Sequence, residues 1–162
     1  QWAGLKFFNV YGPNEYHKGG MKSVVAQIWP KVAAGETVEL FRSHNPNYPD
    51  GGQLRDFVYV DDVVDIVDWL LATPDVSGVF NAGSGQARSF ADLARATFVA
   101  AGKTPSIVYV DMPETIRDRY QYFTEARMDR IRALGFPGQS TPLEEGVRRY
   151  VQGFLSQSDP YR

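Results

Sequence analysis

Residues 55–72 read RDFVYVDDVVDIVDWLLA and join a strand-forming run directly to a run with helical spacing. Phe57 to Val60 alternates aromatic and β-branched residues, which is typical of a short buried strand. Asp61 and Asp62 stand where carboxylates can accept hydrogen bonds from the free amide groups of a helix start. From Val63 to Ala72 the apolar residues cover most of the helix circumference, so we expect a buried helix. The stretch therefore predicts a strand that leads straight into a helix.

Strand-like and helix-like segments alternate on both sides of this unit. The other strands are expected at 5–11, 38–41, 78–82 and 107–110, with 120–123 as a further candidate. The other helices are expected at 21–34, 89–101, 126–134 and 142–155. Loops rich in glycine and proline, above all 43–52, separate these segments. Such alternation predicts an α/β protein.

Local signals should define several helix ends. Ser89 with Asp92, and Thr141 with Glu144, have the spacing of a capping box, in which side chains and backbone amides satisfy each other. Pro30 has no amide hydrogen to donate, so it should kink or split the helix around it.

The composition excludes several classes of protein. The 162 residues include 17 Lys and Arg against 19 Asp and Glu, a net charge of −2, which argues against a broad nucleic-acid footprint and a polybasic membrane surface. There is no Cys and there are 2 His, which excludes disulfides, Cys-based metal sites and a histidine-rich metal site. No apolar run approaches the ~20 residues of a membrane-spanning helix. We expect a packed cytoplasmic protein with no metal, nucleic acid or membrane partner.

Two loops could belong to a ligand site, and each also has a purely structural interpretation. Gly83-x-Gly85 lies between a strand and a helix, where backbone amides can hold a phosphate. Arg88 stands at the third glycine position of such a motif, so a structural turn is the favoured interpretation. Lys18 lies on a loop flanked by glycines and could exchange a proton with a substrate, or could be an exposed loop lysine.

Three further features stay open in the same way. Arg55 precedes the strand at 57–60 and could bind a diphosphate through two parallel hydrogen bonds, or could pair with a nearby acid. Asp61 and Asp62 could form an acid–base pair, although a helix cap with a solvated neighbour is the favoured interpretation. Tyr120 could present its phenol to a ligand or belong to an aromatic strand in the core.

Several of these features occur, in the same order, in one family. The segments are Phe8-Asn9-Val10-Tyr11-Gly12-Pro13, Arg55-Asp56-Phe57-Val58-Tyr59-Val60-Asp61-Asp62-Val63, and Phe80-Asn81-Ala82-Gly83-Ser84-Gly85 followed by Ser89-Phe90. They resemble segments of the extended short-chain dehydrogenase/reductases that act on nucleotide sugars, which have a Rossmann-like α/β fold with a substrate-binding domain. Within that family, His17-Lys18-Gly19-Gly20-Met21 and Arg119-Tyr120-Gln121-Tyr122-Phe123-Thr124 are similar to motifs of the ADP-glyceromanno-heptose 6-epimerases.

The resemblance implies an isomerase that inverts C6 of ADP-glyceromanno-heptose with NADP, through a transient 6-keto sugar, to supply heptose for the lipopolysaccharide core. It implies that Lys18 is a second acid/base beside a tyrosine, and that Val10 contacts the nicotinamide end of NADP. It also implies a substrate site, in which Arg55 holds the diphosphate and the other residues are Asn9, Gly20, Gln27, Phe41, Arg42, Ser43, His44 and Tyr120. Gly20 and Gln27 stand where this family commonly has Ser and His.

The similarity covers nearly all of the chain, about 4–154, but only about the C-terminal half of such an enzyme. The chain opens on Gln1, and it has neither a glycine-rich NADP-binding turn near its start nor a Tyr-x-x-x-Lys pair. We therefore expect a C-terminal half that is inactive alone and belongs to a homo-oligomer. Its expected parts are remnants of the NADP-binding domain at 1–12 and 57–83 and the substrate-binding domain at 13–56 and 84–162.

Two other functions remain open. The parent protein could be a 4-epimerase or dehydratase of another nucleotide sugar, with NAD or NADP. Alternatively, the chain could be a non-catalytic module that binds a nucleotide sugar.

Overall fold

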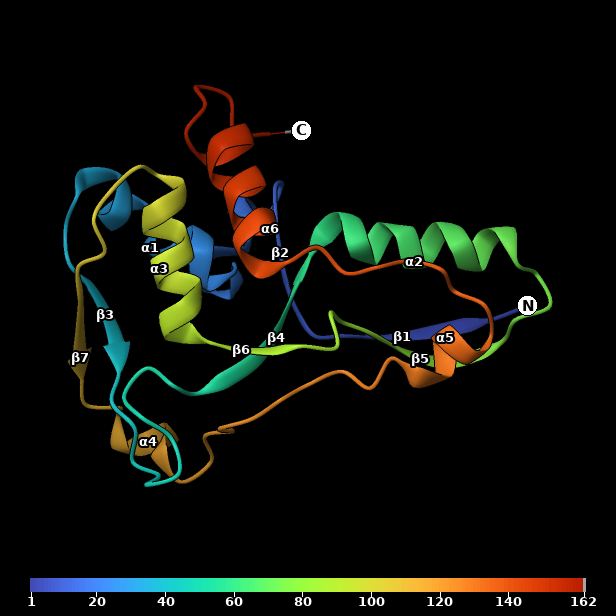
Figure 1. Cartoon of the computed structure of the whole chain (residues 1–162), viewed down its shortest axis with the longest axis horizontal. Coiled ribbons are helices and arrows are strands. Elements are labelled where there is room, and N and C mark those ends of the chain that lie inside the picture. The colour runs from blue at the N-terminus through green and yellow to red at the C-terminus, as the bar shows by residue number, and fades with distance from the viewer. Residues whose placement is uncertain (162) are drawn as a thin grey trace.

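The computed structural model describes residues 1–161, and Figure 1 shows the course of the chain. The strands are β1 (Ala3–Phe7), β2 (Asn9–Tyr11), β3 (Val38–Phe41), β4 (Leu54–Tyr59), β5 (Gly78–Ala82), β6 (Ala87–Ser89) and β7 (Ile107–Val110). The α-helices are α1 (Val24–Ala34), α2 (Val60–Ala72), α3 (Phe90–Ala100), α4 (Glu114–Arg117), α5 (Asp129–Ala133) and α6 (Leu143–Tyr150). A 3-10 helix, η1 (Tyr16–Met21), precedes α1, and a π-helix, η2 (Val151–Leu155), follows α6.

The strands form small separate sheets. β1 and β5 are parallel partners, in register from Ala3 opposite Gly78. β2 and β4 are parallel, and β6 runs antiparallel along β4. β3 and β7 form a further parallel pair. The expected α/β class is confirmed, and the strands predicted at 38–41, 78–82 and 107–110 have the predicted bounds.

The elements gather at two ends of the molecule, with β4 and β6 between them (Figure 1). α1, α3, α6 and the β3–β7 pair form one end, and β1, β5, α2 and α5 form the other. The strand predicted at 5–11 is divided at Phe8 between two sheets, as β1 and β2. The Phe8 amide still donates to Ala82 O at 3.0 Å, whereas Asn9 already pairs with β4. The break carries the chain from one sheet to the other.

The predicted helix caps have different outcomes. At α3 the capping box is confirmed, because the Asp92 amide donates to Ser89 Oγ at 3.0 Å and the Ser89 amide donates to Asp92 Oδ2 at 3.3 Å. The box at Thr141 is wrong, since the amide and hydroxyl of Thr141 donate to the Asp62 carboxylate at 2.9 and 2.6 Å. Asp62 in turn lies inside α2, which begins at Val60. The tertiary contact between Asp62 and Thr141 thus replaces the two local helix caps that these residues were expected to form.

Pro30 does not split α1, so the split, one of the two effects expected of it, does not occur. The helix is continuous across Pro30 and is secured at both ends. Ser23 Oγ accepts a hydrogen bond from the Ala26 amide at 3.3 Å, and Gly35 closes the helix in the left-handed conformation with φ 74°. Buried Val32 adds tertiary packing beyond the proline. These contacts compensate for the amide that Pro30 lacks.

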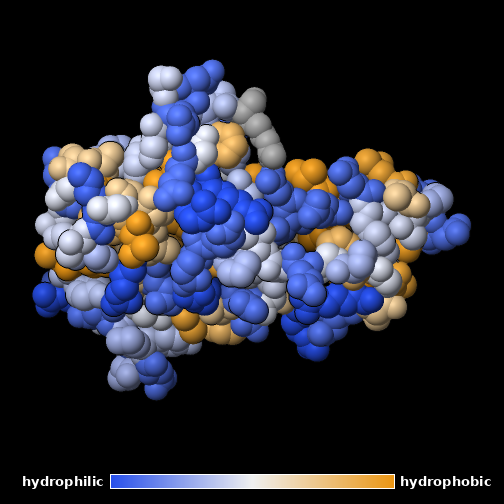
Figure 2. Space-filling model, turned by 45° about the horizontal axis from the view of Figure 1, so that its top comes forward, coloured by the Kyte–Doolittle hydropathy of each residue, from blue (hydrophilic) through white to orange (hydrophobic). Residues whose placement is uncertain are grey.

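α2 is buried on one face only, which corrects the expectation of a fully buried helix. Ile66 and Leu70 are buried, whereas Val64, Val67 and Leu71 are 47%, 37% and 72% exposed. Their spacing places the exposed three on one stripe of the helix. Figure 2 shows hydrophobic residues on the surface of the end of the molecule that holds α2, β1 and β5.

The segment before α5 is mostly extended. Residues 120–123 do not form the expected strand, although Leu54 and Phe123 form a single bridge. The helix expected at 126–134 is shortened to α5, because the Ala126 amide donates to the buried Asp56 carboxylate at 2.9 Å instead of joining a helical turn. The short helix α4 has no counterpart among the predicted elements.

Candidate functional site

Two adjoining cavities lie beside α1 and the start of α3. The first has a volume of about 300 Å³ and the second a volume of about 410 Å³. Val24, Gln27 and Phe90 line both cavities and form a shared wall. The two cavities therefore offer adjacent subsites for one elongated ligand.

Aromatic and aliphatic side chains dominate the first cavity. Phe41 comes from the end of β3, Tyr120 from the segment after α4, and Ile28 and Leu40 from α1 and β3. The Phe41 and Tyr120 rings meet edge to face with centroids 6.4 Å apart. Burial raises the pKa of the Tyr120 phenol, which therefore stays neutral at ordinary pH. This cavity suits a flat, largely apolar group.

Arg55 lies against two aromatic rings of the first cavity's lining. Its guanidinium carbon is 5.2 Å from the centroid of the Tyr120 ring and 5.6 Å from that of the Phe90 ring. One guanidinium nitrogen donates to Leu54 O at 2.8 Å. Among residues 1–161 no acid forms an ion pair with Arg55. The cation is thus held by ring stacking and keeps donors for a ligand.

The turn at 83–85 wraps a protein carboxylate. Asp56, which is fully buried, accepts hydrogen bonds from the Ser84 amide at 2.6 Å, the Ser84 hydroxyl at 2.8 Å and the Gly85 amide at 2.9 Å. A Cβ at Gly83 would collide with the Cβ of Ala126. The amides that could have cradled a phosphate are already engaged, so the structural interpretation of Gly83-x-Gly85 is confirmed.

The second cavity lies where β2 meets the loop around η1. Asn9 and Val10 from β2 line it together with Gly20 and Lys22 from the loop. Gln27 supports the loop, because its side-chain amide donates to Gly20 O at 3.3 Å and to Lys22 O at 2.7 Å. The cavity thus combines a strand end with a loop that carries ammonium groups.

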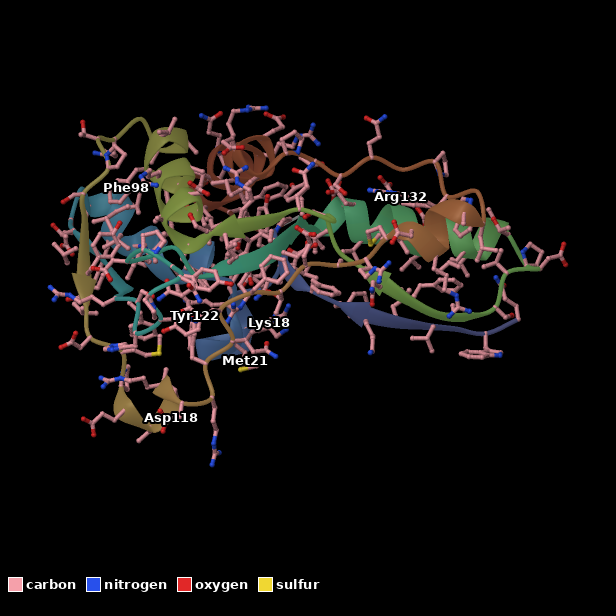
Figure 3. All side chains as sticks on the ribbon, turned by 60° about the horizontal axis from the view of Figure 1, so that its bottom comes forward. Lys18, Met21, Phe98, Asp118, Tyr122 and Arg132 are labelled. Carbon is pink, nitrogen blue, oxygen red and sulfur yellow. The ribbon has the colours of Figure 1, made fainter. Side chains whose placement is uncertain are left out.

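Lys18 lies on that loop but lines neither cavity. It is exposed, and its neighbour Gly19 interrupts η1 with φ 54°. Gly20, Met21 and Lys22, which follow directly, do line the second cavity. Figure 3 shows Lys18 and Met21 close to each other on this loop. The loop therefore carries Lys18 near the site without bringing it into the wall.

Four other predicted residues stand outside the cavity walls, namely Arg55, described above, and Arg42, Ser43 and His44. Arg42 Nε donates to Tyr109 O at 3.2 Å, and the Ser43 amide donates to Asp50 Oδ1 at 2.8 Å. The His44 amide donates to the Tyr122 hydroxyl at 2.9 Å. In the structure these contacts shape the loop at 42–52.

Several lining residues are missing from the sequence prediction. Lys22 is a second ammonium group beside the cavity, four residues after Lys18, and its only sequence signal is the preceding Gly-Gly-Met. Gln53 is buried, and its side-chain amide donates to Phe41 O and Arg42 O at 3.3 and 3.2 Å. Phe90 could have been found from its place directly after the Ser89 cap.

Residues 1–161 contain no group of three or more His, Asp or Glu that could hold a metal ion. Over the same residues, no helix has the length and apolar character needed to span a bilayer.

Comparison with known proteins connects this chain to a family. The model of the NAD dependent epimerase/dehydratase family matches residues 1–83. An ADP-L-glycero-D-manno-heptose-6-epimerase from Nitratidesulfovibrio vulgaris is 52% identical over 159 residues, which are 98% of this chain and 49% of that protein. One from Fusobacterium nucleatum is 48% identical, over 99% of this chain and 50% of that protein. The chain spans about half the length of the curated relatives it matches.

Solved structures agree with the fold. The ADP-L-glycero-D-manno-heptose-6-epimerase of Helicobacter pylori superposes with a TM-score of 0.76 at 29% identity, over 96% of this chain and 45% of that one. The UDP-glucose 4-epimerase of Thermus thermophilus, solved with NAD, gives a TM-score of 0.74 at 28% identity, over 96% of this chain and 47% of that one. The fold is thus part of the Rossmann-like fold of the extended short-chain dehydrogenase/reductases.

Proposed function

The chain belongs to the NAD dependent epimerase/dehydratase family, and we propose that it forms the substrate-binding half of an ADP-heptose 6-epimerase. Relatives with that name match nearly the whole chain at 48–52% identity. The observation that carries the proposal is the position of Arg55, which lies outside both cavity walls but stacks on Tyr120 of the first cavity and on Phe90, a residue that lines both.

An ADP-linked sugar matches the two cavities in order. The adenine ring would occupy the aromatic cavity with Phe41 and Tyr120, since both offer apolar surface to a flat base. Arg55 would bind the diphosphate, because a guanidinium matches phosphate oxygens with parallel hydrogen bonds. The heptose would then extend into the second cavity, where Asn9, Gly20 and Gln27 supply polar groups.

In this proposal Lys18 exchanges a proton with the C6 oxygen of the sugar. Inversion at C6 needs an acid/base group near that oxygen on each face, and a lysine on a glycine-flanked loop can supply one of them. Lys22 of the same loop is the competing candidate, because it lines the second cavity and Lys18 does not. Replacing each lysine by Met separates their roles.

The pyridine nucleotide, which we propose to be NADP, would contact this chain at Val10. Val10 and Asn9 line the second cavity at β2, so this chain offers a wall for the nicotinamide end. When bound, the cofactor would remove hydride from C6 and return it to the other face of a transient 6-keto sugar. The remaining cofactor contacts would come from polypeptide outside residues 1–162.

Residues 1–12 and 57–83 would belong to that larger cofactor-binding domain. Within residues 1–161, β1 and β5 form a parallel sheet of two strands, although parallel sheets are normally buried on both faces within larger assemblies. Trp2 and Phe7 are 62% and 59% exposed beside this sheet. Both features favour a larger sheet, with 13–56 and 84–162 as the substrate-binding domain. We extend the proposal to a cytoplasmic homo-oligomer that supplies lipopolysaccharide heptose.

The test joins this chain to the N-terminal half of the Nitratidesulfovibrio vulgaris relative, which we call the completed enzyme. Proton NMR should detect the C6 epimer when the completed enzyme is incubated with ADP-heptose and NADP, and no epimer with this chain alone. Turnover by the isolated chain would contradict the proposed division of labour. The likeness to the UDP-glucose 4-epimerase favours one rival, which predicts C4 inversion of UDP-glucose and no reaction with ADP-heptose.

A further inference from the structure

One buried carboxylate closes the loop that carries Lys18. Glu15 directly precedes η1, and the residue is only 4% exposed. Glu15 Oε2 accepts a hydrogen bond from the Ser23 amide at 2.5 Å, and Oε1 accepts one from the Ser23 hydroxyl at 2.6 Å. The Tyr150 hydroxyl also donates to Oε1, at 2.9 Å. Residues 15 and 23 bracket the loop, so this carboxylate joins its two ends.

No cation among residues 1–161 balances this buried charge. Among residues 1–161, Glu15 forms no ion pair with Lys, Arg or His. Taking a carboxylate out of water is costly unless strong hydrogen bonds compensate, and a neutral or apolar closure would avoid that cost. Hydrogen bonds to a carboxylate are, however, shorter and stronger than neutral ones. The arrangement therefore favours a precisely held loop over maximum stability.

The three groups at Glu15 belong to rigid parts of the fold. Ser23 is also the N-cap of α1, through the Ala26 amide. Tyr150 is fully buried at the end of α6, directly before the π-helix η2, and such irregular turns are frequent at functional sites. Burial and the Glu15 charge raise the pKa of Tyr150, so its hydroxyl remains a donor. The base of the loop is thus attached to both helices.

The tip of the loop is more exposed than its base, and the Gln27 side chain supports it at Gly20 and Lys22. The Lys18 amide donates to Glu15 O at 3.0 Å, which connects the lysine to the base. Beyond it, Gly19 has a left-handed φ of 54°, and Met21 is 87% exposed. The position of Lys18 therefore depends on where the base of the loop is fixed.

We propose that Glu15 is a positioning residue, which fixes the loop between α1 and α6 and so determines where the Lys18 ammonium meets the substrate. This inference rests on the proposed acid/base role of Lys18. Glu15 itself touches neither cavity and takes no part in proton transfer.

The test is a double-mutant cycle with Glu15→Gln and Lys18→Met in the completed enzyme. The Gln side chain keeps the size of Glu but turns an NH2 group toward the donors of Ser23 or Tyr150. We expect kcat to fall about tenfold with little change in KM, since misplacing a catalytic group by about 1 Å can cost up to about 100-fold. In the Lys18→Met background the Glu15→Gln change should have no further effect on kcat. An equal loss in both backgrounds would overturn the proposal.

A matched control and a second measurement complete the test. Glu125 also accepts a backbone hydrogen bond, from the Ala87 amide at 2.9 Å, so Glu125→Gln makes the same chemical change away from the loop and should leave kcat unchanged. In the chain alone, Glu15→Gln should speed amide hydrogen exchange over 16–22 and leave α3 protected. Faster exchange everywhere, or no change over 16–22, would refute the positioning role. If Lys18→Met alone left kcat unchanged, the proposed acid/base role would fail separately.

Discussion

Replacing Asp56 by Asn should strongly destabilise the protein, because this fully buried carboxylate receives four hydrogen bonds. The donors are the amides of Ser84, Gly85 and Ala126 and the hydroxyl of Ser84. An Asn side chain has only one oxygen. Its least costly orientation turns the NH2 group toward Ser84, whose hydroxyl can rotate to accept, and leaves the Ser84 amide without an acceptor.

The free-energy cost follows from these contacts. A buried amide without an acceptor costs about 1–3 kcal/mol. The bonds from Gly85 and Ala126 would go to a neutral oxygen instead of a carboxylate, at about 1 kcal/mol each. The expected loss in the free energy of unfolding is therefore about 3–5 kcal/mol, which is a large part of the 5–15 kcal/mol typical of a folded protein.

Urea denaturation of the wild-type and Asp56→Asn chains measures this loss. With an m-value of about 2 kcal/mol/M, the midpoint should fall by about 2 M while m stays the same. Ser84→Ala is the matched control, since it keeps the carboxylate and its three amide donors and removes only the hydroxyl, which also bonds the Gln86 backbone, so it should cost about 1–2 kcal/mol. If Asp56→Asn cost no more than Ser84→Ala, the interpretation of Asp56 as the centre of this turn would be wrong.

Three further predictions concern other parts of the molecule. Arg55→Lys should weaken ADP binding about tenfold in calorimetry, because Lys offers neither the planar stacking nor the paired donors of Arg; unchanged affinity would exclude Arg55 from the diphosphate site. Gly146→Ala should lower the free energy of unfolding by about 1–3 kcal/mol in thermal melts, since its Cβ would press on the buried Tyr11 phenol of β2. The Cβ of Gly153→Ala meets no atom within 4 Å, so this variant should melt like the wild type. The Arg88 hydrogen bond lowers the pKa of Glu144 in the folded protein. The stability that this pair contributes is therefore fully present above the unfolded pKa of about 4.3, and it is lost as the pH falls through the lower folded pKa. Arg88→Gln should therefore reduce the difference between the free energies of unfolding at pH 6 and pH 3. The reduction should be less than about 1 kcal/mol, because the pair is largely exposed. An unchanged difference would show that the pair does not contribute to acid destabilisation.

Local patterns predicted those parts of the fold that local forces decide. The strands at 38–41, 78–82 and 107–110 and the Ser89 cap of α3 have their signals within single short segments, and their prediction was correct. The Thr141 cap failed because Asp62, far away in the sequence, binds the same donors. A rule based on residue spacing within one segment cannot include a competing acceptor from a distant segment.

The candidate site, like the fold, was predicted in part. Motif resemblance selected Phe41, Gln27 and Tyr120, which line the first cavity, and Asn9 and Gly20, which line the second. Sequence reasoning could not separate lining residues from supporting ones. Arg42, Ser43 and His44 belong to the same loop, but their described contacts are hydrogen bonds within the protein.

The sequence by itself determined the α/β class, most of the strands and the family, because these depend on periodicity and on short contiguous motifs. Only the tertiary structure decided that Glu15 joins the ends of the Lys18 loop to Tyr150, and that Asp56 fills the turn at 83–85. Both carboxylates bind donors from distant segments. Burial makes any unsatisfied donor costly, so the fold as a whole selects which acceptor each one receives.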